Sequence, residues 1–352
     1  MINSNFSLNK LEQTFVIAEA GSNWKCGTYE EDLDQAVKLI EIAAKCGADA
    51  VKFQTYKAET VYVENAGSSN YLSKYGINDN INKIFENLSM PYEMIPELQK
   101  KCMDNNIMFM STPFSVKDAE QVDPFVEIHK IASFEINHIR LIEFLAETKK
   151  PIIISTGAST YEEIEFAVNL IRKKGNENIA LLQCTSKYPC SIESLNLAVI
   201  PKIHEKFNVP IGLSDHSINP IIGPVTATAI GARIIEKHFT LDRNLPGPDH
   251  PFALIPDELK KMIDAIRDTE RAIGSSAKRI LDEEVELRNF AKRSIQAITD
   301  IKRGEILKEG KNFDILRSGN KKRGMEPRFI SKIEGKKSER EFKKGEGVFL
   351  DE

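Results

Sequence analysis

The chain has 352 residues, with 48 Lys and Arg against 52 Asp and Glu, and a formal net charge of −4. A hydrophobic fraction of 41% and a charged fraction of 28% are typical of a globular protein and exclude disordered, collagen-like and disulfide-scaffold chains. At roughly 150 residues per domain this length predicts two domains, and the near-neutral charge argues against a nucleic-acid binder.

Eight short apolar runs, each as long as a buried parallel strand, alternate with amphipathic segments. The predicted strands cover residues 14–18, 50–54, 107–111, 126–131, 151–155, 179–184, 209–213 and 233–238. The clearest predicted helices cover residues 32–46, 161–173, 217–231 and 257–273. Eight alternations in about 240 residues predict an α/β fold of the (β/α)8 TIM-barrel type rather than a doubly wound sheet.

One connection in this barrel is longer than the fold requires. Between the second and third predicted strands, residues 58–87 are rich in Asn, Tyr, Ser and Glu. An insertion after a barrel strand usually forms part of the active-site wall, so we expect this segment to border a site.

The sequence changes character after residue 285. Residues 286–352 contain 18 Lys and Arg against 12 Asp and Glu, a net charge of +6, so residues 1–285 carry −10. Short strand-like runs at 293–299 and 313–316 are separated by glycine-containing turns. We therefore predict a barrel domain over 1–285 and a small β-rich domain over 286–352, linked by a helical stretch at 257–290.

Neither a membrane nor a secretory segment is predicted. No run reaches the roughly 18 apolar residues of a membrane span, and the N-terminus lacks the cationic and then apolar pattern of a signal peptide. The five cysteines are odd in number and scattered, as expected of reduced thiols. We expect a cytoplasmic protein that binds no membrane and no nucleic acid.

Polar residues stand at or just after the end of each predicted strand. They are Glu19, Lys52, Gln54, Thr112, Lys130, Ser133, Glu135, Ser155, Thr156, Thr185, Tyr188, Ser214, Asp215, His216, Glu236, Lys237 and His238. Lys52, Lys130 and Lys237 interrupt apolar runs, and charged side chains are rarely buried without partners. Because the carboxyl ends of barrel strands meet at one mouth, these residues predict a shared site there.

Nine motifs in order carry a family resemblance. They read IAEAGSN (17–23), AVKFQT (50–55), MSTPFS (110–115), HKIASFEI (129–136), ISTGAS (154–159), QCTSKYP (183–189), GLSDHS (212–217), EKHFTLDR (236–243) and LPGPDH (245–250). In these motifs the chain resembles the sialic acid synthase family, which includes N-acetylneuraminate, legionaminate and pseudaminate synthases. Its tail resembles the small antifreeze-like (SAF, β-clip) domain of those enzymes.

The resemblance implies a transferase of carbohydrate biosynthesis. Such an enzyme condenses phosphoenolpyruvate (PEP) with N-acetylmannosamine or a diacetamido-dideoxyhexose, and yields a nine-carbon 3-deoxy-2-keto sugar acid and phosphate. The family also implies a domain-swapped homodimer, in which Arg317 of the small domain reaches the partner's barrel and holds the N-acyl group. The loop after this arginine reads Arg-Ser-Gly here, where the family has Arg-Pro-Gly.

The resemblance also implies a role for each matching residue. Lys52 and Lys130 would supply the fixed positive charge that PEP requires, Glu135 matches a carboxylate near the reacting carbons, and His238 completes the expected catalytic set. The expected substrate-binding residues are Glu19, Gln54, Thr112, Ser133, Ser155, Ser186, Tyr188, Ser214, Asp249 and Arg317.

The expected metal site departs from the family. The resemblance implies a divalent metal, typically manganese, held by two histidines, of which His238 matches one. Trp24 stands at the other position, and an indole nitrogen cannot act as a ligand. Three accounts stay open: Cys26 replaces the missing ligand, the enzyme works without a tightly held metal, or the chain has lost synthase activity.

Two other functions also stay open. One is a related synthase that uses a different acceptor sugar. Trp24, at the end of the site where the aldehyde would bind, suggests this alternative. A non-catalytic homologue would bind a sugar without PEP and would release no phosphate. The motif at 246–250 (PGPDH) resembles the neuraminate and legionaminate branch more than the pseudaminate branch, which does not fix the acceptor.

Overall fold

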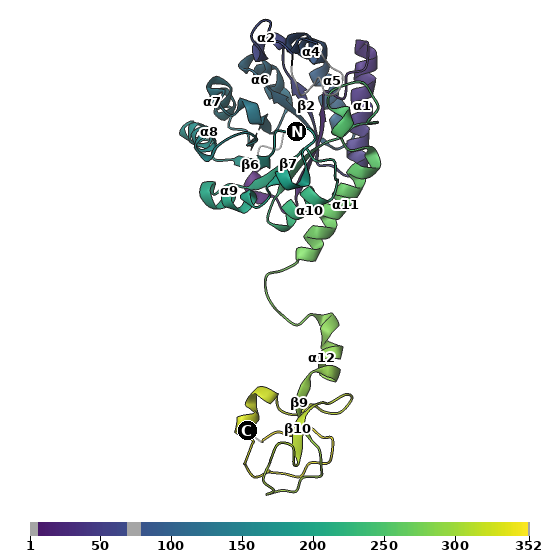
Figure 1. Ribbon diagram of the computed structural model, residues 1–352, viewed down its shortest axis with the longest axis vertical. Helices are drawn as coiled ribbons and strands as arrows, with labels where there is room; N and C mark the ends of the chain where they lie inside the picture. The colour runs from purple at the N-terminus through teal and green to yellow at the C-terminus, as the bar shows by residue number, and fades with distance from the viewer. Residues whose placement is uncertain (1–5, 69–78, 351–352) are drawn as a thin grey trace. The chain divides into compact units, whose positions relative to one another are not determined.

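The computed structural model describes residues 6–68 and 79–350, which form two compact units, Met1–Gly274 and Ser275–Glu352 (Figure 1). The division lies before the predicted boundary at residue 285. The predicted helical link over 257–290 is wrong, because helix α11 (Pro256–Ile273) ends at Gly274, whose φ of 56° is left-handed. A separate helix, α12 (Val285–Ala291), belongs to the second unit.

The first unit contains the eight parallel strands that the sequence predicts. They are β1 (Phe15–Gly21), β2 (Ala50–Thr55), β3 (Met108–Pro113), β4 (His129–Ile131), β5 (Ile152–Ser155), β6 (Ile179–Cys184), β7 (Ile211–Asp215) and β8 (Ile234–His238). Their order in the sheet is β3-β2-β1-β8-β7-β6-β5-β4, so β1, the first strand in the chain, pairs with β8, the last. Strands β3 and β4 lie next to each other at the remaining seam. The strands therefore form a nearly closed TIM-like barrel, as predicted.

Helices surround these strands (Figure 1). Besides α11, they are α1 (Tyr29–Cys46), α5 (Met94–Asp104), α6 (Val116–Val122), α7 (Ile139–Glu147), α8 (Tyr161–Lys173), α9 (Val199–Phe207) and α10 (Ile222–Ala229). Helix α8 has the predicted bounds because Thr160 and Glu163 form a capping box at its start. An equivalent box at Thr28 and Glu31 starts α1 earlier than predicted.

The predicted insertion forms two extra helices between β2 and α5. They are α2 (Ala58–Val61) and α4 (Ile81–Leu88), and the Asn80 side chain accepts a hydrogen bond at the start of α4. Residues 69–78 of the insertion lie outside the described residues.

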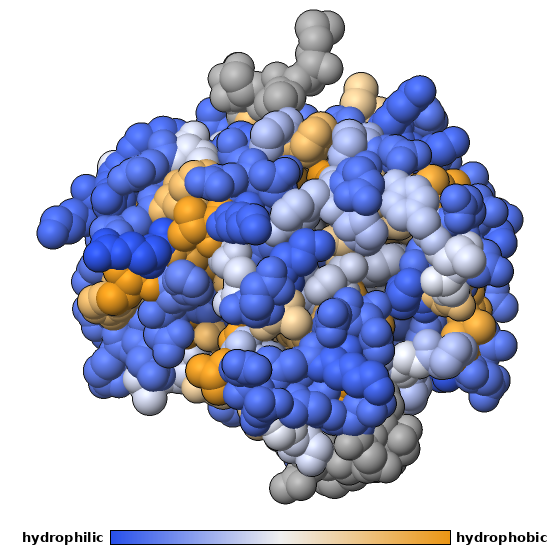
Figure 2. All heavy atoms as spheres, turned by 90° about the horizontal axis from the view of Figure 1, so that it is seen from above, coloured by the Kyte–Doolittle hydropathy of each residue, from blue (hydrophilic) through white to orange (hydrophobic). Residues whose placement is uncertain are grey.

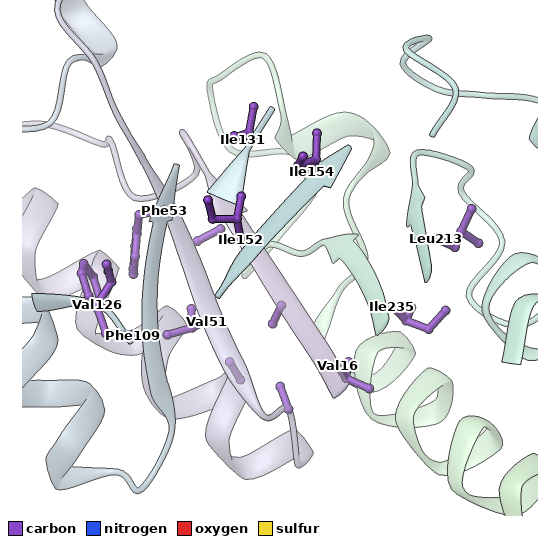
Figure 3. Close-up of a cluster of buried hydrophobic side chains, with 14 of the residues drawn as sticks. Val16, Val51, Phe53, Phe109, Val126, Ile131, Ile152, Ile154, Leu213 and Ile235 are labelled. Carbon is purple, nitrogen blue, oxygen red and sulfur yellow. The ribbon is translucent and has the colours of Figure 1, made fainter. Parts of the chain in front are cut away.

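Strand alternation divides the buried side chains of the barrel into two sets. On β1, Val16 and Ala18 belong to the large core between strands and helices, which Figure 3 shows around Val16. Ile17 belongs to a separate apolar cluster inside the barrel. Glu19 is the next inward-facing position, at the mouth. The barrel interior is therefore apolar at one end and polar at the other, and Glu19 belongs to the polar end.

The second unit is small and β-rich. Strands β9 (Arg293–Ala297) and β10 (Phe313–Arg317) pair antiparallel, near the predicted positions. Ile295, Phe313, Phe342 and Val348 belong to its own apolar core.

The surface is mostly hydrophilic and the cysteines are unpaired. Figure 2 shows a mostly hydrophilic face on which hydrophobic side chains gather in separate patches. Over residues 6–68 and 79–350, no helix has the length and apolar character needed to cross a membrane. All five cysteines lie in this part of the chain and are free thiols.

Candidate active site

One pocket of about 580 Å³ lies at the carboxyl ends of the barrel strands, a size typical of small-molecule sites. The predicted site residues that line it are Glu19, Lys52, Gln54, Thr112, Lys130, Ser133, Glu135, Ser155, Ser186, Tyr188, Ser214, His238 and Asp249. The structure thus brings together every barrel residue that was expected to be catalytic or to bind substrate. Thr156, Thr185, Asp215 and Lys237, which were expected at the barrel mouth, do not line the pocket, and neither do Trp24 and Cys26. Arg317 belongs to the second unit, where it is exposed at the end of β10.

Two lysines and two glutamates form a buried ion network at the floor of this pocket. Lys52 Nζ lies 2.5 Å from Glu19 Oε2 and 3.7 Å from Glu236 Oε2. Lys130 Nζ lies 3.8 Å from Glu236 Oε1. All four side chains are buried, so each charge depends on its partners. Glu236 joins the two lysines into one network.

Hydroxyl groups fix the directions of these charges. Lys52 donates to Thr112 Oγ1 at 3.0 Å, and Lys130 donates to Ser155 Oγ at 2.7 Å. Ser214 donates to Glu236 Oε1 at 3.0 Å. The floor therefore holds two ammonium groups in fixed directions, bordered by hydroxyl groups and paired with carboxylates, and these donors suit an anionic ligand.

The network also sets the protonation of its two glutamates. Burial raises the pKa of Glu19, despite the opposing effect of Lys52. Burial also disfavours the ionised form of Glu236, but Lys130 and Lys52 outweigh it and hold the pKa of Glu236 below its ordinary value. Glu236 therefore carries negative charge between the lysines, and Glu19 is the member that protonates more readily.

A second group of hydroxyls converges on Gly157, which follows β5. The Gly157 N–H donates to Ser133 Oγ at 3.0 Å, and a Cβ at residue 157 would lie 2.2 Å from Ser186 Oγ. Ser186 Oγ is buried and has no hydrogen-bond partner within the described part of the chain. A buried hydroxyl without a partner is costly, so this group is placed to bind a ligand.

Glu135 ends a short 3-10 helix, Ser133–Glu135, directly after β4. Its Oε2 atom is buried and without a hydrogen-bond partner among the described residues. Burial raises the pKa of Glu135 to about 7, against the opposing charge of Lys130. A carboxyl group with this pKa can take up or release a proton at neutral pH.

Aromatic rings and histidines form the side of the pocket next to β7 and β8. The rings of Tyr188 and His216 lie 4.1 Å apart, and those of His216 and His238 lie 5.5 Å apart. Burial lowers the pKa of His238 to about 3, so its ring is neutral. His238 Nδ1 lies 4.0 Å from Asp249 Oδ2, which accepts hydrogen bonds from Ser22.

The residues near His238 do not fit a tightly held metal. Trp24 is buried in the core and does not line the pocket. Cys26 is exposed and lies outside the pocket. Partial desolvation of its thiol and the nearby Asp32 carboxylate raise the pKa of Cys26, which disfavours the metal-binding thiolate. In residues 6–68 and 79–350 no group of three His, Cys, Asp or Glu is placed to hold a metal. Beside His238 the remaining candidate ligands are His216, whose ring lies 5.5 Å from that of His238, and Asp249, and these three are not placed as a coordinating set.

Sequence reasoning missed or misplaced three features of the site. Glu236 and His216, which the sequence places at the barrel mouth but not among the catalytic or substrate-binding residues, both line the pocket. Lys237, expected at the mouth, instead pairs with Asp215 at 2.6 Å and does not line the pocket. Because successive side chains of a strand point to opposite faces, Glu236 and Lys237 on β8 point in opposite directions. The third feature is an apolar side of the pocket, to which α4 contributes at helical spacing.

Comparisons with known proteins agree with these observations. A profile described as the NeuB family matches residues 39–278. The chain is 37% identical to pseudaminic acid synthase of Campylobacter jejuni, over 98% of this chain and 97% of that protein. It is 39% identical to N,N'-diacetyllegionaminic acid synthase of the same species, over 88% and 92%. The solved structure of spore coat polysaccharide biosynthesis protein SpsE from Bacillus subtilis matches with a TM-score of 0.65, 37% identity and coverage of 99% and 97%.

The raised pKa of Glu135 predicts that Glu135→Gln stabilises the protein more at pH 8 than at pH 5. Between the ordinary pKa of 4.5 and the folded value of about 7, the folded chain keeps a proton that the unfolded chain loses. Glu135 therefore lowers the free energy of unfolding as the pH rises through this window. Measured by urea unfolding, the difference between variant and wild type should grow by about 2 kcal/mol. The same change at exposed Glu193 controls for the substitution itself, and an equal difference at both pH values would contradict the assignment.

Proposed function

Because the chain belongs to the NeuB family of sialic acid synthases, and is thus a synthase-type enzyme, we propose that it condenses PEP with an N-acylated amino sugar. The observation that carries this proposal is the buried floor formed by Lys52 and Lys130 with its hydroxyl groups. PEP carries a carboxylate and a phosphate, and such a floor can bind both. The product is a nine-carbon 3-deoxy-2-keto sugar acid for surface glycans.

The proposed reaction forms one carbon–carbon bond. Carbon 3 of PEP attacks the open-chain aldehyde of the sugar, and the aldehyde oxygen takes up a proton. Water then adds to carbon 2 of the former PEP, and phosphate leaves with cleavage of the bond between carbon 2 and oxygen. Lys52 and Lys130 hold the anionic groups, and Ser186 donates its unpaired hydroxyl. Glu135, with a pKa of about 7, takes the proton from the attacking water.

The acceptor binds beside Tyr188 and Asp249 in this proposal. N-acetylmannosamine and the diacetamido-dideoxyhexoses are the candidates, because relatives from the pseudaminic and the legionaminic branches match at 37% and 39% identity. A synthase with another acceptor is the alternative within the enzyme class. The complete ion network favours catalysis over a binding-only homologue. Since PEP is a metabolite of the cytoplasm, we infer a cytoplasmic enzyme.

The first test measures phosphate and keto-acid formation from PEP with each acceptor. We predict that Lys130→Ala lowers kcat/KM for PEP at least about 100-fold, because it removes a buried cation and leaves Glu236 with one partner. Lys202→Ala, at an exposed lysine of α9, is the matched control. Circular dichroism checks that both variants fold. Full activity of Lys130→Ala would remove the assignment of the PEP site, and wild type that consumes no PEP with any acceptor would reject the proposed function.

We further infer that turnover needs no tightly held metal, because among the described residues His238, His216 and Asp249 are not placed as a set of three ligands. The purified enzyme should contain less than one divalent metal per chain by elemental analysis. Chelation with EDTA should leave the rate of phosphate release unchanged, and Cys26→Ser should behave as wild type. A loss of rate after chelation that added Mn²⁺ restores would refute this inference. Restoration in wild type but not in Cys26→Ser would identify Cys26 as a ligand.

Finally, we propose that a second copy of the chain supplies Arg317 to the active site. Two observations support this. Arg317 is exposed at the end of β10. In helix α12, Leu287 and Phe290 are 63% and 48% exposed, more apolar surface than a short isolated helix usually presents to water. In the dimer the guanidinium group would bind the N-acyl group of the sugar.

Complementation tests this arrangement. Lys130→Ala and Arg317→Ala subunits should each be inactive alone. When they are co-expressed, about a quarter of the wild-type rate should return, because half of the dimers are mixed and each mixed dimer has one intact site. Absence of any recovery, with mixed dimers verified by affinity tags, would show that Arg317 does not act on the partner.

A further inference from the structure

An apolar wall lines one side of the pocket, apart from the ion network. It consists of Tyr56, Tyr62, Ile81, Ile84, Phe85, Leu88 and Phe114. All but Phe114 come from the segment between β2 and α5, mainly from the extra helix α4. The insertion that the sequence predicts as a border of the site is therefore largely apolar where it meets the pocket.

The wall is one continuous surface centred on Phe85. The Phe85 ring lies 4.8 Å from the Tyr56 ring and 4.9 Å from the Tyr62 ring, and Tyr56 lies 5.2 Å from Phe114. Within the wall, Ile81 and Ile84 are buried and form a small cluster with Phe85 and Leu88. This cluster gives α4 its own support, so the partly exposed side chains hold a fixed shape toward the pocket.

The position of the wall relates it to the acceptor rather than to PEP. Glu135 and Asp249 line the same pocket as Tyr62 and Tyr56, and after burial their charges raise the pKa of Tyr62 and of Tyr56, respectively. The wall therefore shares the pocket with Glu135 and Asp249, where the proposed function places the sugar. Phe134, next to Glu135, is 63% exposed and extends this apolar lining at the mouth.

The chemistry of the two substrates separates their uses of this surface. PEP is small and anionic and gains nothing from contact with an apolar surface. Sugar hydroxyl groups placed against the wall would lose their hydration without gaining hydrogen bonds. Alkyl carbons, by contrast, bind to such a surface in proportion to the area they bury. Resting on the synthase reaction proposed above, we propose that the apolar wall is the binding subsite for an alkyl group of the acceptor sugar. This group is either the carbon chain of an N-acyl substituent or the methyl group of a 6-deoxy sugar.

The experiment compares kcat/KM at saturating PEP across two series of acceptors. One series lengthens the N-acyl group from acetyl to propanoyl to butanoyl, and the other pairs each 6-hydroxy sugar with its 6-deoxy form. Wild type should gain about fourfold per buried methylene or methyl, the equivalent of 0.8 kcal/mol. A gain in the first series assigns the wall to the acyl chain, and a gain in the second assigns it to the deoxy methyl.

Variants of the wall should remove this gain. We expect Phe85→Ala to bring the acceptors of the responding series close to equal kcat/KM, with the KM for PEP unchanged. Tyr62→Ala is the second variant, because Tyr62 is 38% exposed and contributes less to the fold. Phe166→Ala is the matched control, since Phe166 is exposed on α8 and does not line the pocket, and it should keep the wild-type selectivity.

Several outcomes would overturn the subsite. One is a flat response of wild type to both series, and another is an equal loss for every acceptor in the variants. A third is a changed oligomeric state in Phe85→Ala with unchanged selectivity, which would make the wall a contact with a second copy. Each of these leaves phosphate release by wild type intact, so it rejects the subsite alone. Absence of phosphate release with every acceptor would reject the synthase reaction itself.

Discussion

The cost of burying ammonium groups inside a barrel governs the rest of this site. Lys52 and Lys130 are buried, and Glu236 lies between them and pairs with both. Without Glu236 the lysines would repel each other and lose their ionised forms, and the pocket would lose its affinity for an anion. The serine and threonine hydroxyls direct these charges but cannot replace the carboxylate. The catalytic floor is thus a balanced set in which each member is required to keep another charged.

The pocket combines this charged floor with an apolar wall of different origin. The floor comes from barrel strands, whose backbones are fixed by hydrogen bonds to neighbouring strands. The wall comes mainly from α4, which lies on an insertion and has a small core of its own. Such a division lets the reaction depend on the rigid scaffold and the acceptor preference depend on a replaceable segment. The proposed chemistry and the proposed selectivity are therefore expected to respond to different substitutions.

Much of the fold follows from local sequence signals, and the errors have physical causes. All eight strands were predicted because short, mostly apolar runs mark strands that are buried on both faces. The helical stretch was predicted to run on from Asp257 to Phe290, but Gly274 adopts a left-handed conformation and ends α11. Composition alone hid the apolar wall, since polar residues dominate the insertion. Its helical period was nonetheless readable at positions 81, 84, 85 and 88. The exposure of Cys26, by contrast, depends on tertiary packing that no local pattern reports.

Strand β8 shows how narrow the tolerance of such a site is. Glu236 faces the pocket, whereas Lys237, the next residue, faces away and pairs with Asp215. Insertion of one residue before Glu236 would turn Glu236 toward Asp215 and Lys237 toward the pocket. The lysines of the floor would then lose their shared carboxylate, and two carboxylates would face each other behind the strand, so one event would upset both charge balances. Length changes in this strand are therefore far more damaging than substitutions, and viable descendants of this sequence should differ in loop lengths while β8 keeps its register.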